Sequence, residues 1–139
     1  MILKMSHTSV YVNNQEEAKQ FYVNKLGFEV RNDTPMGPEF RWLTVGPKDQ
    51  PEIDIVLMPI MASPFLSEED AETMRGLLSR GAFGNGVLIT PNCQEEYETL
   101  SAKGVEFLSP PTERPYGIEA VLKDNSGNWF SLVERPLEM

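Results

Sequence analysis

The stretch that decides the fold is HTSVYVNNQEE at residues 7–17, because a similar stretch, VLITPNCQEE, returns at residues 87–96. Each copy has the pattern of a short strand, a polar turn and the acidic start of a helix. A second similarity follows each copy, KLGFEV at 25–30 and KGVEF at 103–107. Two copies are too few for a solenoid, so the sequence predicts a duplicated module.

Both copies contain the signals that start and stop a helix. Asn14 is placed to cap a helix whose third residue is Glu17, and Gly27 is placed to end it. In the second copy Asn92 takes the capping position and Gly104 the terminating one. Short β-rich runs separated by Pro- and Gly-containing turns follow each helix, at residues 28–31, 40–45, 53–58, 105–108, 118–122 and 129–134.

The predicted order is therefore βαβββ, twice, which is an α+β fold. We expect a single domain over residues 1–139, with a first module at 1–60, a helical connector at 61–84 and a second module at 85–139. Within the connector a helix is predicted at 67–79, capped by Ser67 with Asp70 at its third position. A packed connector is the favoured interpretation, and a lid that gates a ligand is the alternative.

Composition excludes several classes of function. Among 139 residues there are 12 Lys and Arg against 21 Asp and Glu, a formal charge of -9, which argues against a nucleic-acid partner. Cys93 is the single cysteine, so an intrachain disulfide and a multi-cysteine zinc site are both excluded. The most apolar stretch, 53–66, is broken by two prolines, and we expect a cytoplasmic protein with no membrane partner. The acidic charge suits a cationic ligand, although solubility alone also explains it.

Three segments carry a resemblance to a known family: HTSVYV at 7–12, FY with LGF at 21–28, and DNSGNWF at 124–130. Together with the paired βαβββ order they resemble the vicinal oxygen chelate superfamily, which includes glyoxalase I, extradiol dioxygenases and bleomycin-binding proteins. The resemblance implies two modules whose curled mixed sheets face a ligand cavity, usually in a homodimer. In the metalloenzymes of that family, His or Glu from the first and fourth strands of each module holds a divalent metal ion.

The expected metal-binding positions are mostly filled by other residue types. His7 occupies the first position and is the only histidine, but the fourth-strand position falls at Val56. In the second module the positions fall at Asn85 or Gly86 and at Ser131. One strong ligand of four predicts that no metal cofactor is held, and His7 is then a hydrogen-bonded strand residue. A divalent metal stays the alternative, if His7 acts with a displaced carboxylate.

That carboxylate would be Glu119, Asp54 or Glu134. Glu119 stands where the family often has Arg, which would favour cationic or hydroxyl-rich ligands, and it would act as a general base if desolvation raised its pKa. The alternative for Glu119 is a solvated strand carboxylate beside Lys123. The predicted catalytic residues are thus Glu119 and His7.

Strand alternation and residue chemistry supply the other candidates. Ser9 and Tyr11 share a face with His7, and Ser131 is suited to hydrogen-bonding a ligand. Trp42 and Trp129 are able to stack on a planar or cationic group, although strand aromatics usually belong to a core. The predicted ligand-binding residues are Ser9, Tyr11, Trp42, Val56, Trp129 and Ser131.

These observations favour a homodimeric, metal-independent binder of a small cationic or aromatic molecule, of the bleomycin-resistance type. The alternative is an enzyme, a divalent-metal lyase, isomerase or dioxygenase that uses His7 with Glu119. A third reading is an interaction domain without chemistry.

Overall fold

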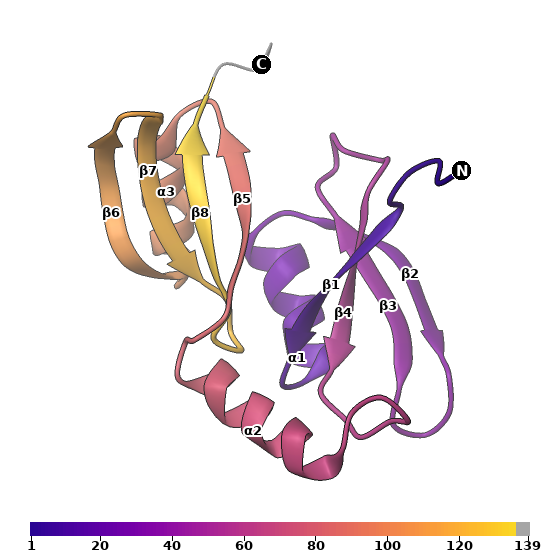
Figure 1. Ribbon diagram of the computed structural model, residues 1–139. Coiled ribbons are helices and arrows are strands. Elements are labelled where there is room, and N and C mark those ends of the chain that lie inside the picture. The colour runs from indigo at the N-terminus through magenta and orange to yellow at the C-terminus, as the bar shows by residue number, and fades with distance from the viewer. Residues whose placement is uncertain (136–139) are drawn as a thin grey trace. The chain divides into compact units, whose positions relative to one another are not determined.

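The computed structural model describes residues 1–135. The chain forms two compact units, Met1–Leu77 and Leu78–Met139. Each unit holds one four-stranded mixed sheet with a helix on one face, as Figure 1 shows. The units repeat one topology, so each is described by itself.

The first unit begins with strand β1 (His7–Val12), helix α1 (Gln15–Gln20) and a π-helical turn, η1 (Phe21–Lys25). Strands β2 (Glu29–Pro35), β3 (Arg41–Gly46) and β4 (Asp54–Pro59) follow, and most of helix α2 (Glu68–Ser79) also belongs to this unit. The sheet order is β1-β4-β3-β2, with β1 parallel to β4 and the other neighbours antiparallel.

Strand β1 shows why one face of this sheet is covered. Val10 and Val12 are buried, whereas His7, Ser9 and Tyr11 are exposed on the opposite face. Apolar side chains from α1, η1, β3 and β4 complete the core, among them Ala18, Phe21, Tyr22, Leu43, Val45 and Leu57. The alternation predicted for β1 is confirmed, and we call the face that carries His7, Ser9 and Tyr11 the open face because it is exposed along β1.

The buried side chain of Gln15 locks α1 onto the sheet. Its amide nitrogen donates to the carbonyls of Arg41 and Leu57, both at 2.8 Å, and its amide oxygen accepts from the Arg41 backbone N–H at 3.1 Å. All the polar groups of a buried amide are costly to leave unpaired, so these three bonds fix the helix start against β3 and β4.

The second unit repeats the arrangement with β5 (Gly84–Thr90), α3 (Cys93–Ala102), β6 (Glu106–Arg114), β7 (Gly117–Lys123) and β8 (Trp129–Glu134). Its sheet order is β5-β8-β7-β6, and β5 runs parallel to β8. The turn between β7 and β8 is organised by Asp124, whose Oδ1 accepts from the backbone N–H groups of Ser126, Gly127 and Asn128 at 2.8, 2.9 and 2.9 Å. The segment that carried the resemblance is therefore a carboxylate-centred turn.

The α+β class and the two βαβββ modules are confirmed. The predicted caps are also present: Asn14, Ser67 and Asn92 accept from the backbone N–H of the residue three positions on, at 2.8, 3.0 and 3.0 Å. Strands β2 and β6 run several residues past their predicted ends, because register shifts in each pair let pairing continue to the turn. Over residues 1–135 no helix is long and apolar enough to cross a membrane.

Candidate ligand-binding site

The open face of the first sheet carries polar side chains at one end. His7 on β1 lies opposite Asp54 on β4, and its Nε2 is 3.5 Å from Asp54 Oδ2. The His7 ring also lies 5.8 Å, centroid to centroid, from the indole of Trp42 on β3. Ser6 Oγ is 2.7 Å from His7 Nδ1. The predicted residues His7 and Trp42 are thus brought together, beside Asp54.

Arg31, which lies in the bulge of β2, forms an ion pair with Asp54. Its Nη1 donates to Asp54 Oδ1 at 3.0 Å and its Nε lies 3.1 Å from Glu29 Oε2. Its two terminal nitrogens also reach carbonyls of the segment that leads into β4, those of Pro47, Gln50, Pro51 and Ile53. The Arg31 guanidinium already binds the Asp54 carboxylate, and its positive charge would repel a second cation that approached Asp54.

These surroundings do not fit a divalent metal ion at His7. A catalytic ion needs about three protein ligands, and His7 has one carboxylate near it, which is already paired with Arg31. Within residues 1–135 no group of three or more His, Cys, Asp or Glu side chains gathers that could hold a metal ion. We therefore derive no chemical step through a metal at this end of the sheet.

Two of the predicted ligand-binding residues lie in the middle of this face. Ser9 on β1 pairs with Val56 on β4, which in turn pairs with Thr44 on β3. Val56 and Thr44 are both buried. The sequence analysis placed the fourth-strand position at Val56, but the register pairs His7 with Asp54, and Val56 pairs with Ser9 two residues farther along.

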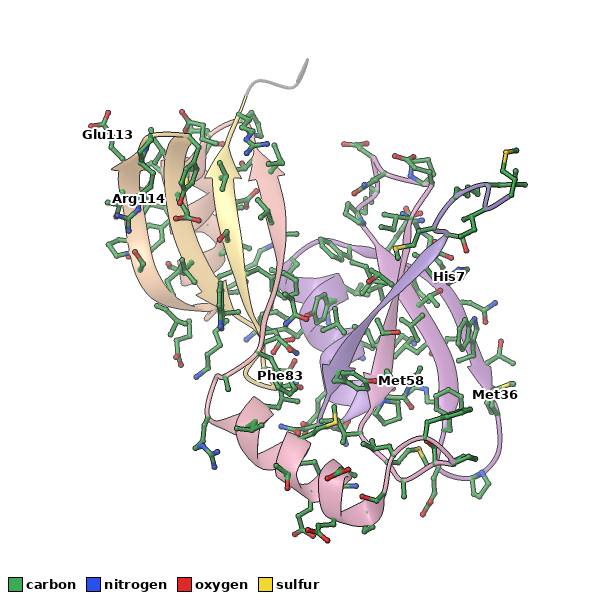
Figure 2. The ribbon with its side chains drawn as sticks, in the orientation of Figure 1. His7, Met36, Met58, Phe83, Glu113 and Arg114 are labelled. Atoms are coloured by element: carbon green, nitrogen blue, oxygen red, sulfur yellow. The ribbon has the colours of Figure 1, made fainter. Side chains whose placement is uncertain are left out.

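An apolar pocket of about 570 Å³ lies at the other end of β1 and β4. Tyr11 and Met58 supply its sheet side, and Figure 2 shows Met58 at the end of β4 opposite to the end where His7 lies. Phe40, just before β3, and Met74 of α2 add to the wall. The remaining lining residues come from the chain between β4 and α2: Pro59, Met61, Ala62, Ser63, Phe65 and Leu66.

The lining has a distinct chemistry. It contains three methionines, three aromatic rings and no ionisable side chain other than the phenol of Tyr11. Ligand pockets of proteins are concave, of about 300–1,000 Å³, and lined mostly by apolar and aromatic side chains. The pocket of the first unit has both properties, so it is the candidate site.

The segment between β4 and α2 is held in place by Arg75 of α2. Its Nε and Nη2 donate to the Ile60 carbonyl at 3.2 and 2.9 Å, and its Nη1 lies 3.1 Å from Glu68 Oε1. We call residues 61–66, the part of the predicted connector that precedes α2, the connector loop. Arg75 thus ties the residue before this loop to the helix after it, and the loop lines the pocket.

A tight turn at the tip of the connector loop presents Phe65. Ser63 and Leu66 exchange backbone hydrogen bonds of 2.9 and 3.2 Å, and the Phe65 N–H donates to Ser63 Oγ at 3.1 Å. The Phe65 side chain is 98% exposed, although it also lines the pocket. Its ring therefore borders the pocket on one side and solvent on the others.

The second unit gathers the other predicted polar residues. Glu119 on β7 accepts from the hydroxyl of Tyr116 at 2.7 Å and from the hydroxyl of Ser131 on β8, and Arg114 Nε lies 3.7 Å away. The Tyr116 hydrogen bond, followed by that of Ser131, lowers the pKa of Glu119, and the same contact raises the pKa of Tyr116. A carboxylate with a lowered pKa is a weaker base, which is the opposite of the raised pKa that general-base catalysis requires.

Trp129 and Asn85, one of the two positions expected to correspond to His7, both contact other residues of the second unit. The indole of Trp129 lies against Gly84, where a Cβ would overlap the ring. Asn85 donates from Nδ2 to Asn128 Oδ1 at 2.7 Å. Glu134 Oε1 accepts from the backbone N–H of Cys93 at the start of α3, so Glu134 faces the helix and Ser131 faces the open side, as alternation predicted.

Of the predicted ligand-binding residues only Tyr11 lines the apolar pocket. Sequence reasoning gave a ligand-gating lid only as the alternative for the connector, and it missed Phe40, Met58, Met74 and the lining residues of the connector loop. A signal was present, because the loop around Pro64 carries Met61, Phe65 and Leu66, and apolar side chains in a loop need something to cover them.

Two βαβββ units with mixed four-stranded sheets, one with an apolar pocket at its end, place the chain in a class of paired-βαβββ proteins. A family model described as the Glyoxalase/Bleomycin resistance protein/Dioxygenase superfamily matches residues 4–132, and the chain belongs to that superfamily. The crystal structure of UcmS2 is 48% identical with a TM-score of 0.89, and the match covers 97% of this chain and 100% of UcmS2.

Two further relatives are informative. TnmS3, an antibiotic binding protein from Streptomyces sp. CB03234, is 29% identical with a TM-score of 0.75, over 97% of this chain and 98% of TnmS3. The uncharacterized protein YetH of Bacillus subtilis (strain 168) is 34% identical, over 96% of this chain and all of YetH.

Proposed function

We propose that this protein binds a small apolar molecule in the pocket of its first unit and performs no reaction on it. The observation that carries the proposal is the pocket of about 570 Å³, walled by Tyr11, Phe40, Met58, Phe65 and other apolar side chains. Burial of apolar ligand surface against such a wall supplies the binding free energy. The similarity to TnmS3, an antibiotic binding protein, supports the same kind of function.

The sequence predicted a cationic or an aromatic ligand, and the side chains that line the pocket favour an uncharged one. A cationic ligand needs a carboxylate or an aromatic cage within reach, and no Asp or Glu lines this pocket. The -9 charge would attract a cation to the surface in general, but the pocket offers it only the faces of three aromatic rings and no carboxylate to balance its charge. An uncharged ligand therefore suits the site better than a charged one.

The proposal is tested with Nile red, an uncharged dye whose fluorescence rises in apolar surroundings. We expect saturable binding that is lost in Met61→Glu, because the substitution places a carboxylate in the pocket wall from an exposed loop position. Met36→Glu is the matched control: Met36 lies between β2 and β3, is exposed, and is absent from the lining. Absence of saturable binding, or equal binding by the two variants, would contradict the proposal.

The enzyme alternative is a divalent-metal lyase, isomerase or dioxygenase of the same superfamily. It would have to use His7 with Asp54 or with Glu119. Asp54 is paired with Arg31, and the hydrogen bonds of Glu119 lower its pKa. Neither carboxylate is prepared for that role, so the binding function is preferred.

We further propose that the protein acts in the cytoplasm as a homodimer. The exposed apolar side chains of Val87 and Ile89 on edge strand β5 and of Leu108 on β6 support self-association, because edge strands with apolar side chains favour pairing or covering. Sedimentation equilibrium at micromolar concentration would show twice the chain mass of 15.7 kDa. A single species of monomer mass would contradict the dimer.

A further inference from the structure

We infer that Met61 of the connector loop is a site of reversible oxidation by hydrogen peroxide, and that conversion of its thioether to the sulfoxide turns ligand binding off. The inference rests on the proposed function, because it concerns the same pocket, and it goes beyond that function by adding a chemical modification that controls it. The observation behind it is that Met61 both lines the pocket and is 37% exposed.

Methionine is concentrated in the wall of this pocket. Three of the seven methionines of the chain line it, Met58 from β4, Met61 from the connector loop and Met74 from α2. Met58 and Met74 are half-buried, whereas Met61 is exposed. Oxygen transfer requires contact between the oxidant and the sulfur, so an oxidant in solution should reach Met61 before the other two.

The chemistry balances without help from another residue. A lone pair of the Met61 sulfur attacks one oxygen of hydrogen peroxide, so an S–O bond forms while the O–O bond breaks. The oxygen that leaves takes up the proton of the transferred hydroxyl group and departs as water. The sulfur is oxidised by two electrons and the peroxide is reduced by two, which turns an apolar thioether into a polar sulfoxide.

The surroundings of Met61 offer little to a sulfoxide oxygen, which is a hydrogen-bond acceptor. Three N–H donors of the connector loop are already in use, because Ser63 and Leu66 donate to each other's carbonyls and Phe65 donates to Ser63 Oγ. A sulfoxide oxygen without a donor turns to water and takes the side chain out of the wall, or stays unpaired beside the ligand. The first outcome removes apolar contact area and the second buries a polar group, so both weaken binding.

Ligand and oxidant compete for the same side chain. A ligand in the pocket covers the pocket-facing side of Met61, so binding should slow the oxidation of Met61 just as oxidation should weaken binding. Met36 supplies the comparison, because it is 57% exposed, more than Met61, and does not line the pocket. A ligand should therefore leave the oxidation rate of Met36 unchanged.

The modification is measured first, on the full-length protein. The protein is treated with hydrogen peroxide for increasing times, with and without saturating Nile red, and catalase stops the reaction before digestion and mass spectrometry. Trypsin releases Met36 in residues 32–41 and the three pocket methionines in residues 49–75, where fragment ions locate the added oxygen. Met61 should react before Met58 and Met74, and Nile red should slow the reaction of Met61 about threefold or more without slowing that of Met36.

Binding is measured second, as the ratio of the Kd for Nile red after and before limited peroxide treatment. In the native protein this ratio should be about ten or more, and methionine sulfoxide reductase with dithiothreitol should return the Kd to its starting value. Met61→Leu has no sulfur at this position, so its Kd should not change on treatment, whatever its starting affinity. Met36→Leu is the matched control, and its ratio should equal that of the native protein.

The outcomes separate the inference from the function on which it rests. If the native protein keeps its affinity after Met61 has been converted, or if Met61→Leu loses affinity as strongly as the native protein does, the switch is refuted and the binding function stands. If Met58 or Met74 reacts before Met61, the assignment of the site is refuted. If the untreated protein shows no saturable binding of Nile red, the proposed function fails and the inference fails with it.

Discussion

Gly127→Ala should destabilise the protein strongly, because this glycine closes the turn between β7 and β8. Its φ is 119°, a region that side-chain-bearing residues rarely adopt, and a Cβ at this position would overlap the carbonyl oxygen of Leu78. The Gly127 N–H also donates to Asp124 Oδ1 at 2.9 Å, together with the N–H groups of Ser126 and Asn128. Relief of the overlap must therefore move a backbone segment that is bonded to a buried carboxylate.

The magnitude follows from these contacts. Forcing a residue other than glycine into a positive φ costs about 1–2 kcal/mol. Displacement that loses one hydrogen bond to a charged group adds about 1.5–3 kcal/mol. We therefore expect Gly127→Ala to lower the free energy of unfolding by about 2.5–5 kcal/mol.

Gly81→Ala is the matched control in the same unit. Its φ is 78°, also positive, but the nearest atom to an added Cβ is the Gly127 carbonyl oxygen at 3.9 Å, an ordinary contact. This variant should lose only the backbone contribution, about 1–2 kcal/mol. Urea unfolding of both variants, followed by circular dichroism, measures the difference. Equal losses in the two variants would refute the reasoning, because the Leu78 overlap and the Asp124 bonds would then contribute nothing.

Three further predictions address the site and its surroundings. Arg75→Ala should weaken Nile red binding about tenfold with little loss of helix content, because the connector loop loses both bonds to Ile60; unchanged affinity by fluorescence titration would contradict this. The Arg41 hydrogen bond, assisted by Lys19, lowers the pKa of Asp33 to about 2, below its ordinary 3.8. The ionised Asp33 therefore stabilises the folded state above pH 4, and this stabilisation is lost as pH falls towards 2. In Asp33→Asn the urea midpoint should consequently fall less steeply over this pH range than in the native protein. Protein purified without chelators should contain less than about 0.1 equivalent of divalent metal by elemental analysis, and His7→Ala should bind Nile red normally; stoichiometric metal that His7→Ala loses would restore the enzyme alternative.

The parts of the fold that were predictable from sequence are those specified by neighbouring residues. The caps at Asn14, Ser67 and Asn92 need only a side-chain oxygen and an N–H group three residues away, so the local pattern is sufficient. The repeat predicted the βαβββ order of elements along the chain in both units for a related reason, since each copy folds by the same local rules. Strand register was harder, because only the three-dimensional pairing shows that His7 meets Asp54 rather than Val56.

Most residues of the candidate site could not be predicted from the sequence. Tyr11 was found because alternation places it on the open face, but Met74 lines the pocket from α2, which Arg75 joins to Ile60 by hydrogen bonds. That contact joins residues fifteen positions apart through one carbonyl, and no periodic pattern reports it. The environment of Glu119 was also hidden, because its pKa is lowered by the hydrogen bond from Tyr116 and then by that from Ser131, which lies on the neighbouring strand.

The two units share a topology, yet the apolar pocket depends on a segment that is not part of the repeat. In the first unit β4 continues into the connector loop and α2, which supply most of the pocket wall. In the second unit β8 occupies the position of β4, and among the described residues only Arg135 follows it. In the first unit the sheet contributes Tyr11 and Met58 to the pocket, whereas most of the other lining residues lie in a loop held by Arg75. Substitutions at Met61, Phe65 or Leu66 can therefore change the ligand without disturbing the packing of Leu43, Val45 and Leu57, because the core lies on the other face of the same sheet.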